Sequence, residues 1–515
     1  MSGENLELFD LPPGLNRTSS QYAAGKSWWN GNLVRWVNRT LTPIGGWVTK
    51  YNLPDISGIV EEAVRSTHSW RDLLKTPWAA YGSANALWAS RINSNGTYTF
   101  YIITPAALGY NPGGKSGYGS GPYGVGPYGI SPSGGTDLDS TAVWSFDNFG
   151  KMLVAVSSQD GRLIIWDPAT PTVEAVAVGE APVDNTLVVV TDEEFLMVMG
   201  GKNNPRRVKW ASRRTYTDWV PTELNSAGGF DLQSNGVIIG ACRVPGGVLV
   251  LTDTDAHLLE YVGPPYYYGR RRISTECELV SINAVFSVSF GAVWLGRSSF
   301  WMYNGAVNKL PCSVEYDVFL NSSLSQAHLV HGGINQYAQE AWWFYPSQDS
   351  SVPNRYAAYG YNKDTNNYWT SGEMPRTAWM NPVWQDKPLG FNDQTIYVQE
   401  TGSTADGALR NVFAETGAIE INNGNSSYRI DRVYPDVVNR DNIAEEVTNL
   451  SMTFKLRQAP GANERTYGPI SISSDTGYIP VRMRARQVSL TIKETAPSAW
   501  GLGKFRIRVK EAGRR

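Results

Sequence analysis

The feature that most limits the fold of this chain is a series of short β-type runs, each carrying an aromatic residue and ending at Gly, Pro, Asn or Asp. The aromatic landmarks, one from each run, are Tyr101, Trp166, Trp210, Tyr261, Tyr303, Tyr361 and Tyr397. Successive landmarks are 65, 44, 51, 42, 58 and 36 residues apart. A four-stranded propeller blade takes roughly 40–50 residues, so most of these intervals fit one blade.

The spacing predicts an all-β fold with a β-propeller of six or seven blades over residues 56–405, preceded by an extended or β segment over residues 1–55. Composition agrees, because only 18% of residues are charged while the chain holds 19 Trp, 27 Tyr and 51 Gly, which is typical of β proteins with many turns. An aromatic-rich β-sandwich would produce similar landmarks and stays an alternative.

Strict alternation of apolar and polar residues marks the last part of the chain and predicts a separate β-sandwich over residues 406–515. In the run 503–511, apolar and basic residues occupy opposite faces of one strand. In the run 478–494, the apolar residues change from odd to even positions around Gln487. Such a change of parity predicts a β-bulge.

A Gly/Tyr-rich stretch at residues 108–136 interrupts the first landmark interval and contains the tandem pentapeptide GPYGV-GPYGI. It cannot contribute a core, because glycine has no side chain and its backbone loses the most entropy on ordering. Tyrosines offer large amphipathic contact surfaces. We expect an insertion between the first and second blades, with Tyr123 and Tyr128 as interface candidates.

Positive charge is concentrated near the C-terminal end of the sequence. Residues 476–515 hold ten Lys/Arg and two Glu, a local charge of +8, so the remainder of this chain of net charge −2 sums to −10. The face made by Arg482, Arg484 and Arg486 therefore has two interpretations, the solvated side of a sandwich or a docking surface for an acidic neighbour.

A second basic cluster follows two prolines within one connection of the predicted propeller. Its candidate contact residues are Tyr266, Tyr267, Arg270, Arg271 and Arg272. Arginine contacts phosphates and tyrosine stacks on bases, so transient, sequence-independent contact with DNA is one interpretation. A pI near 6.2 is low for a dedicated nucleic-acid binder, which favours interface or salt-bridge roles.

Residues that would support catalysis or a cofactor are sparse. His328-x-x-His331 lacks a third ligand of suitable spacing, and the two G-x-G-x-x-G matches are by-products of the pentapeptide repeat. We expect no catalytic, metal-binding or cofactor-binding residues, and a chain that is not an enzyme. Carboxylates far apart in sequence can still meet in space, so a glycosidase-type pair stays open.

The sequence also predicts where the chain is made. Three well-separated cysteines with no C-x-x-C motif argue against a disulfide framework, and no signal peptide or membrane-spanning run is evident. We expect synthesis in the cytoplasm and no membrane insertion.

Three segments resemble the tail nozzle or hub proteins of short-tailed bacteriophages. These segments are PPGLNRTSSQYAAGKSWWNGNLVRWVNRTLTPIGGW (12–47), the Gly/Tyr stretch, and VRMRARQVSLTIKETAPSAWGLGKFRIRVKEAGRR (481–515). The resemblance implies a structural virion protein that forms a ring, typically of six copies, below the portal and adaptor. Such a ring continues the DNA ejection channel, helps retain the genome and contacts tail fibres or spikes. No catalytic residues carry over.

Two other functions compete with the tail hypothesis. A carbohydrate-binding or carbohydrate-cleaving propeller, such as a receptor-recognition protein, would use exposed aromatic residues against sugars and would contain a cleft with carboxylates. A cytoplasmic scaffold of the WD or kelch kind is weakly favoured by the dipeptide Trp166-Asp167.

Overall fold

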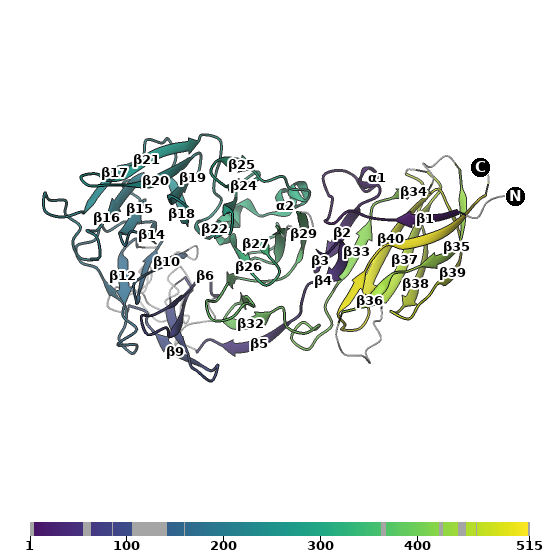
Figure 1. Cartoon of the computed structure of the whole chain (residues 1–515), viewed down its shortest axis with the longest axis horizontal. Helices are drawn as coiled ribbons and strands as arrows, with labels where there is room; N and C mark the ends of the chain where they lie inside the picture. The colour runs from purple at the N-terminus through teal and green to yellow at the C-terminus, as the bar shows by residue number, and fades with distance from the viewer. Residues whose placement is uncertain are drawn as a thin grey trace, which may run out of the picture.

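The structure, a computed structural model, is elongated, with a propeller at one end and a β-sandwich domain at the other (Figure 1). The first and last described strands both lie in the sandwich domain. The residues that the structure describes are 5–54, 63–84, 86–105, 142–158, 160–361, 367–421, 426–440, 450–459 and 461–512.

The propeller has seven four-stranded antiparallel blades within the described residues, which confirms the predicted all-β propeller. The first four are blade 1, β6 (Ser66–Arg71), β7 (Pro77–Gly82), β8 (Leu87–Ile92) and β9 (Tyr98–Ile102); blade 2, β10 (Trp144–Phe149), β11 (Met152–Ser157), β12 (Leu163–Trp166) and β13 (Val176–Ala177); blade 3, β14 (Leu187–Val190), β15 (Leu196–Met199), β16 (Arg207–Trp210) and β17 (Gly228–Asp231); and blade 4, β18 (Ile238–Val244), β19 (Gly247–Thr252), β20 (Ala256–Gly263) and β21 (Tyr267–Ser274).

The other three blades complete the ring. They are blade 5, β22 (Val285–Val288), β23 (Gly291–Leu295), β24 (Phe300–Tyr303) and β25 (Val307–Lys309); blade 6, β26 (His331–Asn335), β27 (Glu340–Tyr345), β28 (Arg355–Gly360) and β29 (Tyr368–Glu373); and blade 7, β30 (Ala378–Met380), β31 (Leu389–Asn392), β32 (Thr395–Gln399) and β5 (Trp47–Asn52). Each innermost strand packs against that of the next blade, and β30 packs against β6.

The ring is closed by a strand from the N-terminal part of the chain. β5 pairs antiparallel with β32, with Val48 opposite Val398, and supplies the fourth strand of blade 7. Blade 7 therefore consists of strands from two distant parts of the sequence. This pairing ties the two ends of the propeller segment together without a covalent link.

The seven aromatic landmarks fall one in each blade, except that Tyr361 lies directly after β28 of blade 6. The middle strands of the blades are buried on both faces, as in the fully buried runs of β15 and β27, because each blade is covered by its two neighbours. The Gly/Tyr stretch lies outside the described residues, and the strands that flank it are β9 of blade 1 and β10 of blade 2.

The second domain is a sandwich of three sheets that confirms the predicted C-terminal β-sandwich, but its strands come from both ends of the sequence. The outer sheet has the order β1 (Asn5–Phe9), β42 (Phe505–Glu511), β35 (Tyr428–Tyr434) and β39 (Ile479–Ala485). The second has the order β2 (Trp28–Asn32), β33 (Phe413–Thr416), β40 (Gln487–Glu494), β37 (Leu450–Arg457) and β38 (Arg465–Ile472), with β34 (Ile419–Glu420) beside β40. The third has the order β3 (Val34–Val37), β4 (Thr40–Pro43), β41 (Trp500–Leu502) and β36 (Val437–Asn439).

The N-terminal residues 1–55, predicted as a segment of their own, contribute to both domains. β1 to β4 belong to the sandwich sheets, and β5 belongs to the propeller. The alternation predicted for 503–511 is confirmed, since the apolar residues of β42 are buried and the basic ones lie on the outer face.

The predicted β-bulge at Gln487 is wrong. β39 ends at Ala485 and β40 begins at Gln487, and the two strands lie in different sheets. The backbone N–H of Arg486 between them donates to the carbonyl of Arg457 at 3.0 Å. The apolar parity changes because the chain crosses from one sheet to the other, so the buried side of the strand is reversed.

Helices are few and short in the described part of the chain. The described α-helices are α1 (Gln21–Ala24) and α2 (Glu315–Asn321), and the described 3₁₀ segments are η2 (Ile282–Ala284) and η3 (Leu324–Leu329). None of the helices in the described residues is long and apolar enough to span a membrane. Cys242, Cys277 and Cys312 are free thiols in the structure.

Candidate functional site

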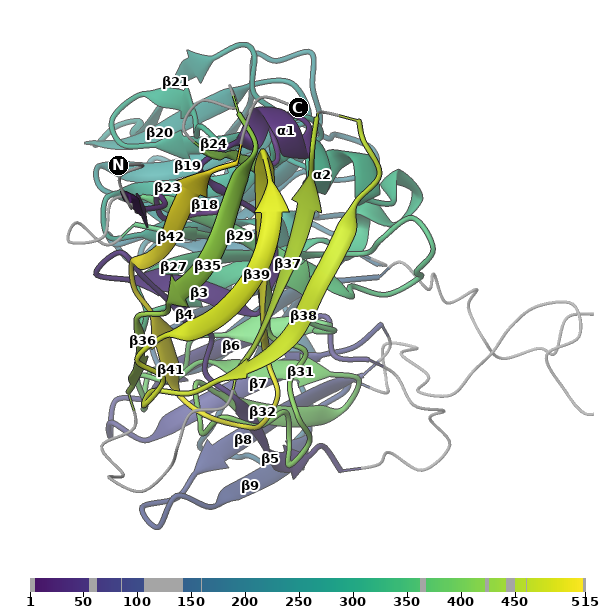
Figure 2. The same cartoon turned by 90° about the vertical axis from the view of Figure 1, so that its right-hand side faces the viewer.

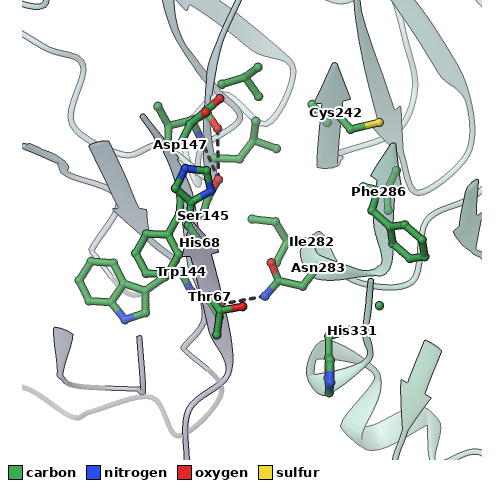
Figure 3. Close-up of a pocket in the computed structure, with 18 of the residues that line it drawn as sticks. Thr67, His68, Trp144, Ser145, Asp147, Cys242, Ile282, Asn283, Phe286 and His331 are labelled. Carbon is green, nitrogen blue, oxygen red and sulfur yellow. Dashed lines mark hydrogen bonds between the residues drawn. The ribbon is translucent and has the colours of Figure 1, made fainter. Parts of the chain in front are cut away.

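A cavity of about 340 Å³ lies on the propeller axis. Its walls come from the innermost strands and from the η2 segment, and Figure 3 shows Asp147 and His68 on one side with Cys242 and Phe286 on the other. Small-molecule sites typically have volumes of roughly 300–1,000 Å³. The cavity is therefore large enough for a small ligand.

Asp147 is a buried carboxylate in this wall. Its Oδ2 accepts a hydrogen bond from the backbone N–H of Val190 at 2.8 Å, and its Oδ1 lies 3.3 Å from Nη2 of Arg243. Next to it, Nε2 of His68 lies 3.1 Å from the side-chain oxygen of Asn148. Burial lowers the pKa of His68. The lining thus combines a carboxyl, a guanidinium and an imidazole group.

The axis is obstructed by a contact between blades that are not neighbours. Asn283 of η2, which precedes blade 5, donates through Nδ2 to Oγ of Ser66 in blade 1 at 2.9 Å (Figure 3). The same amide lies 3.4 Å from the carbonyl of Arg65. Because this contact spans the axis, the interior of the propeller is a pocket and cannot serve as a passage for a DNA duplex.

His331 lines the same cavity, and its ring is held by contacts within the fold. Its Nδ1 donates to the carbonyl of Leu329 at 3.1 Å, and its ring stacks on Phe344 with centroids 5.2 Å apart. The described residues contain no group of three or more His, Cys, Asp or Glu side chains arranged to hold a metal ion.

Acidification is expected to destabilise the protein through His331. Burial lowers the pKa of His331 to about 4, whereas an unfolded histidine titrates near pH 6.5. Below about pH 6.5 the imidazole of His331 is protonated in the unfolded chain but stays neutral in the folded chain. The free energy of unfolding therefore decreases as the pH falls toward 4. The loss reaches about 3 kcal/mol.

Melting temperatures measured between pH 7 and pH 4.5 check this expectation. His331→Asn keeps a donor for the Leu329 carbonyl and should flatten the profile. His68 adds to the slope in the same direction, because its pKa is also lowered by burial. An unchanged slope in His331→Asn would contradict the assignment.

The predicted cluster at residues 266–272 forms the β20–β21 hairpin of blade 4. Tyr266 is 78% exposed at the tip. The guanidinium of Arg270 lies 4.9 Å from the ring centroid of Phe230, and Nη2 of Arg271 lies 3.5 Å from Oε1 of Glu260. Tyr267 is partly buried and packs beside Phe195, while Arg272 is exposed. These arginines therefore take part in local contacts on the surface of the propeller.

The predicted basic residues of the sandwich are only partly brought together. Arg482 and Arg484 lie exposed on the outer face of β39, whereas Arg486 lies half-buried at the corner between two sheets. Sequence reasoning missed Arg429 and Arg432 of β35, which share the outer sheet with β39. The run YRIDRVY, in which polar residues interrupt apolar ones, was the signal that could have identified them, although its alternation breaks at Asp431 and Arg432. Tyr123 and Tyr128 lie outside the described residues.

A buried ionic cluster between the two domains was also missed. Arg35 of β3 donates through Nη1 to Oε2 of Glu400 and through Nη2 to Oε2 of Glu340, both at 2.9 Å. Its side chain is 7% exposed, and those of Glu340 and Glu400 are 0% and 3% exposed. Asn335 donates to Glu400 at 2.7 Å, and the Tyr368 hydroxyl donates to Glu340 at 2.7 Å.

The two carboxylates of this cluster are not equivalent. Burial raises the pKa of Glu340, and Arg35 does not fully offset that effect. Burial acts in the same sense on Glu400, but the Arg35 guanidinium outweighs it and the pKa of Glu400 is lowered. The two carboxylates of Arg35 are therefore shifted in opposite directions.

Two adjacent glycines allow the chain to pass close to Glu400. The backbone N–H of Gly45 donates to Oε2 of Glu400 at 3.0 Å, and a Cβ on Gly45 would lie 2.6 Å from the Glu400 Cα. A Cβ on Gly46 would lie 2.3 Å from the carbonyl oxygen of Thr404. Any other residue would displace the backbone here. Gly45, Gly46 and Arg35 all belong to the segment 12–47 described above.

Further contacts from this N-terminal segment fix the sandwich against blade 6. The Asn32 side-chain oxygen accepts from the Glu373 backbone at 2.7 Å, and Thr370 donates to the Val34 carbonyl at 2.8 Å. The ring of Trp36 meets that of Tyr368 edge-on, with centroids 5.5 Å apart. We call this set of contacts, together with the Arg35 cluster, the domain joint.

Neither protein-family models nor curated proteins match this chain. Among solved structures, an exo-β-1,3-galactanase from Phanerochaete chrysosporium is 9% identical, covering 89% of this chain and 99% of its own, with a TM-score of 0.27. The Pan2 WD40 domain of Neurospora crassa is 8% identical, covering 71% of this chain and 99% of its own, with a TM-score of 0.39. A glycoside hydrolase is 9% identical, and the match covers 87% of this chain and 98% of the hydrolase chain, with a TM-score of 0.27.

These similarities concern the general β architecture and carry no argument about ligand or reaction. Two of the structures named above are those of glycoside-cleaving enzymes. The prediction that this chain is not an enzyme therefore finds no support in these similarities and is not retained.

Proposed function

We propose that this chain is a structural subunit of a short-tailed bacteriophage tail, a nozzle or hub that forms a ring with further copies of itself. In this proposal the ring resides in the virion and surrounds the passage for DNA. It contacts a portal-adaptor ring on one side and fibre or spike proteins on the other. The observation that carries the proposal is the domain joint.

The joint supports a ring subunit because it links the two domains through buried hydrogen bonds and ion pairs. The segment 12–47, which carries the resemblance to tail proteins, supplies Arg35, Gly45 and Gly46 to it. A buried ionic cluster tolerates little movement, since a charge separated from its partner in the interior costs several kcal/mol. Subunits of a closed ring need such fixed geometry, because small rotations between domains would prevent closure.

The obstructed propeller axis adds a constraint on where DNA would pass. The contact between Asn283 and Ser66 leaves only a pocket inside each propeller. In a ring of several copies the passage therefore lies between subunits and not through any one of them.

Particle mass and symmetry test the proposal. Light scattering and negative-stain imaging of the concentrated protein are expected to give closed rings with a central opening. A protein that stays monomeric at every concentration and binds an oligosaccharide would overturn it.

A carbohydrate-binding protein is the second candidate, and one specific observation favours it. The axial cavity has the volume of a small-ligand site and places Asp147 beside Arg243 and His68. Charged and amide groups of this kind can bind sugar hydroxyls. Calorimetric titration with oligosaccharides, repeated with Asp147→Asn, distinguishes the two candidates.

A further inference from the structure

The outer face of the β1–β42–β35–β39 sheet carries an excess of positive charge. The residues of this basic face are Arg429, Arg432, Arg482, Arg484, Arg506, Arg508 and Lys510. The acidic residue among them is Asp431, which accepts from Nε and Nη2 of Arg508 at 2.6 and 2.7 Å. Figure 2 looks onto this end of the molecule, with β42, β35 and β39 in front of the propeller.

Three of these cations are directly opposite one another on adjacent strands. Lys510 of β42 pairs with Arg429 of β35, which pairs with Arg484 of β39. Residues paired in this way have Cβ atoms roughly 4.5–5.5 Å apart, and like charges at that distance are destabilising. We call these three residues the cationic row. Within the chain, Nη2 of Arg484 donates to the carbonyl of Ala512 at 2.9 Å, and the charge of Lys510 helps to lower the pKa of Asp431. An anionic partner would add carboxylates to a face on which positive charge is in excess.

Exposed leucines lie beside the cations on the same face. Leu6 and Leu8 of the edge strand β1 are 60% and 43% exposed, and they pair with Arg508 and Arg506 of β42. Protein interfaces combine arginine with apolar contact area, whereas a phosphodiester backbone offers leucine no apolar partner. The combination of leucines with arginines therefore favours a protein surface over a nucleic acid.

The rim of the basic face has the same mixed character. Tyr478 is 49% exposed, and the guanidinium carbon of Arg432 lies 4.8 Å from the centroid of the Tyr478 ring. Tyrosine and arginine are among the residues enriched at protein interfaces.

We propose that the basic face docks an acidic surface of another protein, with carboxylates over the cationic row and apolar side chains against Leu6 and Leu8. The proposal does not depend on the tail function, because it rests only on the charge and exposure of this sheet. Long-range attraction between such surfaces speeds association and weakens as salt is added.

Fluorescence anisotropy with a labelled short peptide of alternating Glu and Val tests the proposal at low ionic strength. The wild-type protein should bind this peptide, and Arg429→Ala/Arg484→Ala/Lys510→Ala should weaken binding about tenfold or more. Leu6→Ser/Leu8→Ser should weaken it several-fold. The triple variant should still melt cooperatively, because the loss of the hydrogen bond from Arg484 to Ala512 is offset by the removal of like-charge pairs.

A matched control removes the same number of charges from the propeller. Arg270→Ala/Arg271→Ala/Arg272→Ala should bind the acidic peptide as tightly as wild type does. Equal affinity of the cationic-row variant and wild type would overturn the proposal, as would a wild type that does not bind the peptide. A labelled DNA duplex bound through the cationic row more tightly than the peptide would assign the face to nucleic acid and would also overturn it.

Discussion

Replacing Arg35 by methionine is expected to lower the free energy of unfolding by about 3–5 kcal/mol. The substitution leaves Glu340 and Glu400 buried without the cation that lies between them. The expected decrease in the free energy of unfolding is large because two buried carboxylates lose their cation, whereas a surface ion pair leaves its carboxylate in water. Urea denaturation followed by circular dichroism measures it.

The pair Lys26 and Glu7 supplies the control, since Nζ of Lys26 lies 3.4 Å from Oε1 of Glu7 and its side chain is 58% exposed. Lys26→Met should cost at most about 1 kcal/mol. Adding Glu340→Gln and Glu400→Gln to Arg35→Met should restore part of the loss, because the stranded groups then carry no charge. A loss below about 1 kcal/mol in Arg35→Met would show that the cluster does not hold the domain joint.

Removing residues 1–53 is expected to abolish cooperative folding. The deletion takes away β5, which closes blade 7, and one or more strands from each sandwich sheet. Buried tryptophans such as Trp28 and Trp36 are lost with them. Their combined contribution exceeds the roughly 5–15 kcal/mol by which a typical domain is stable. Thermal melting and hydrogen exchange measure the loss.

Removing residues 1–10 provides the matched control, because it deletes only β1 at the edge of the outer sheet. That variant should fold and melt cooperatively at a lower temperature. Refolding the longer deletion with a synthetic 1–53 peptide should restore a cooperative transition. A deletion of residues 1–53 that melts sharply without the peptide would contradict the closure of the ring by β5.

The propeller was predictable because its signal repeats. Each blade needs a buried strand that ends at a turn, and aromatic residues such as Trp166 and Trp210 mark those strands at near-regular intervals. The sequence leaves the number of blades at six or seven. The last blade takes its fourth strand from residues 47–52, and no sequence pattern near those residues indicates that they pair with β32.

The domain joint and the full basic face were not predictable from spacing. Arg35 and its partners lie more than 300 positions apart, and nothing local marks a charge as buried. Arg429 reaches Arg484 only through the pairing of β35 with β39. The change of parity near Gln487 led to the wrong prediction of a bulge, because a bulge and a crossing between sheets reverse the buried side in the same way.

The pairing of β1 with β42 also fixes the order in which the protein can fold. Asn5 pairs with Val509, so the outer sheet cannot be completed until almost the whole described chain has left the ribosome. In the same way, β5 cannot pair until β32 has been synthesised, although β5 itself is synthesised much earlier. During synthesis the N-terminal strands stay without their partners while the blades form, which exposes them to wrong pairings. Refolding should therefore be slow, and a chaperone that binds the N-terminal strands during translation should raise the yield of native protein.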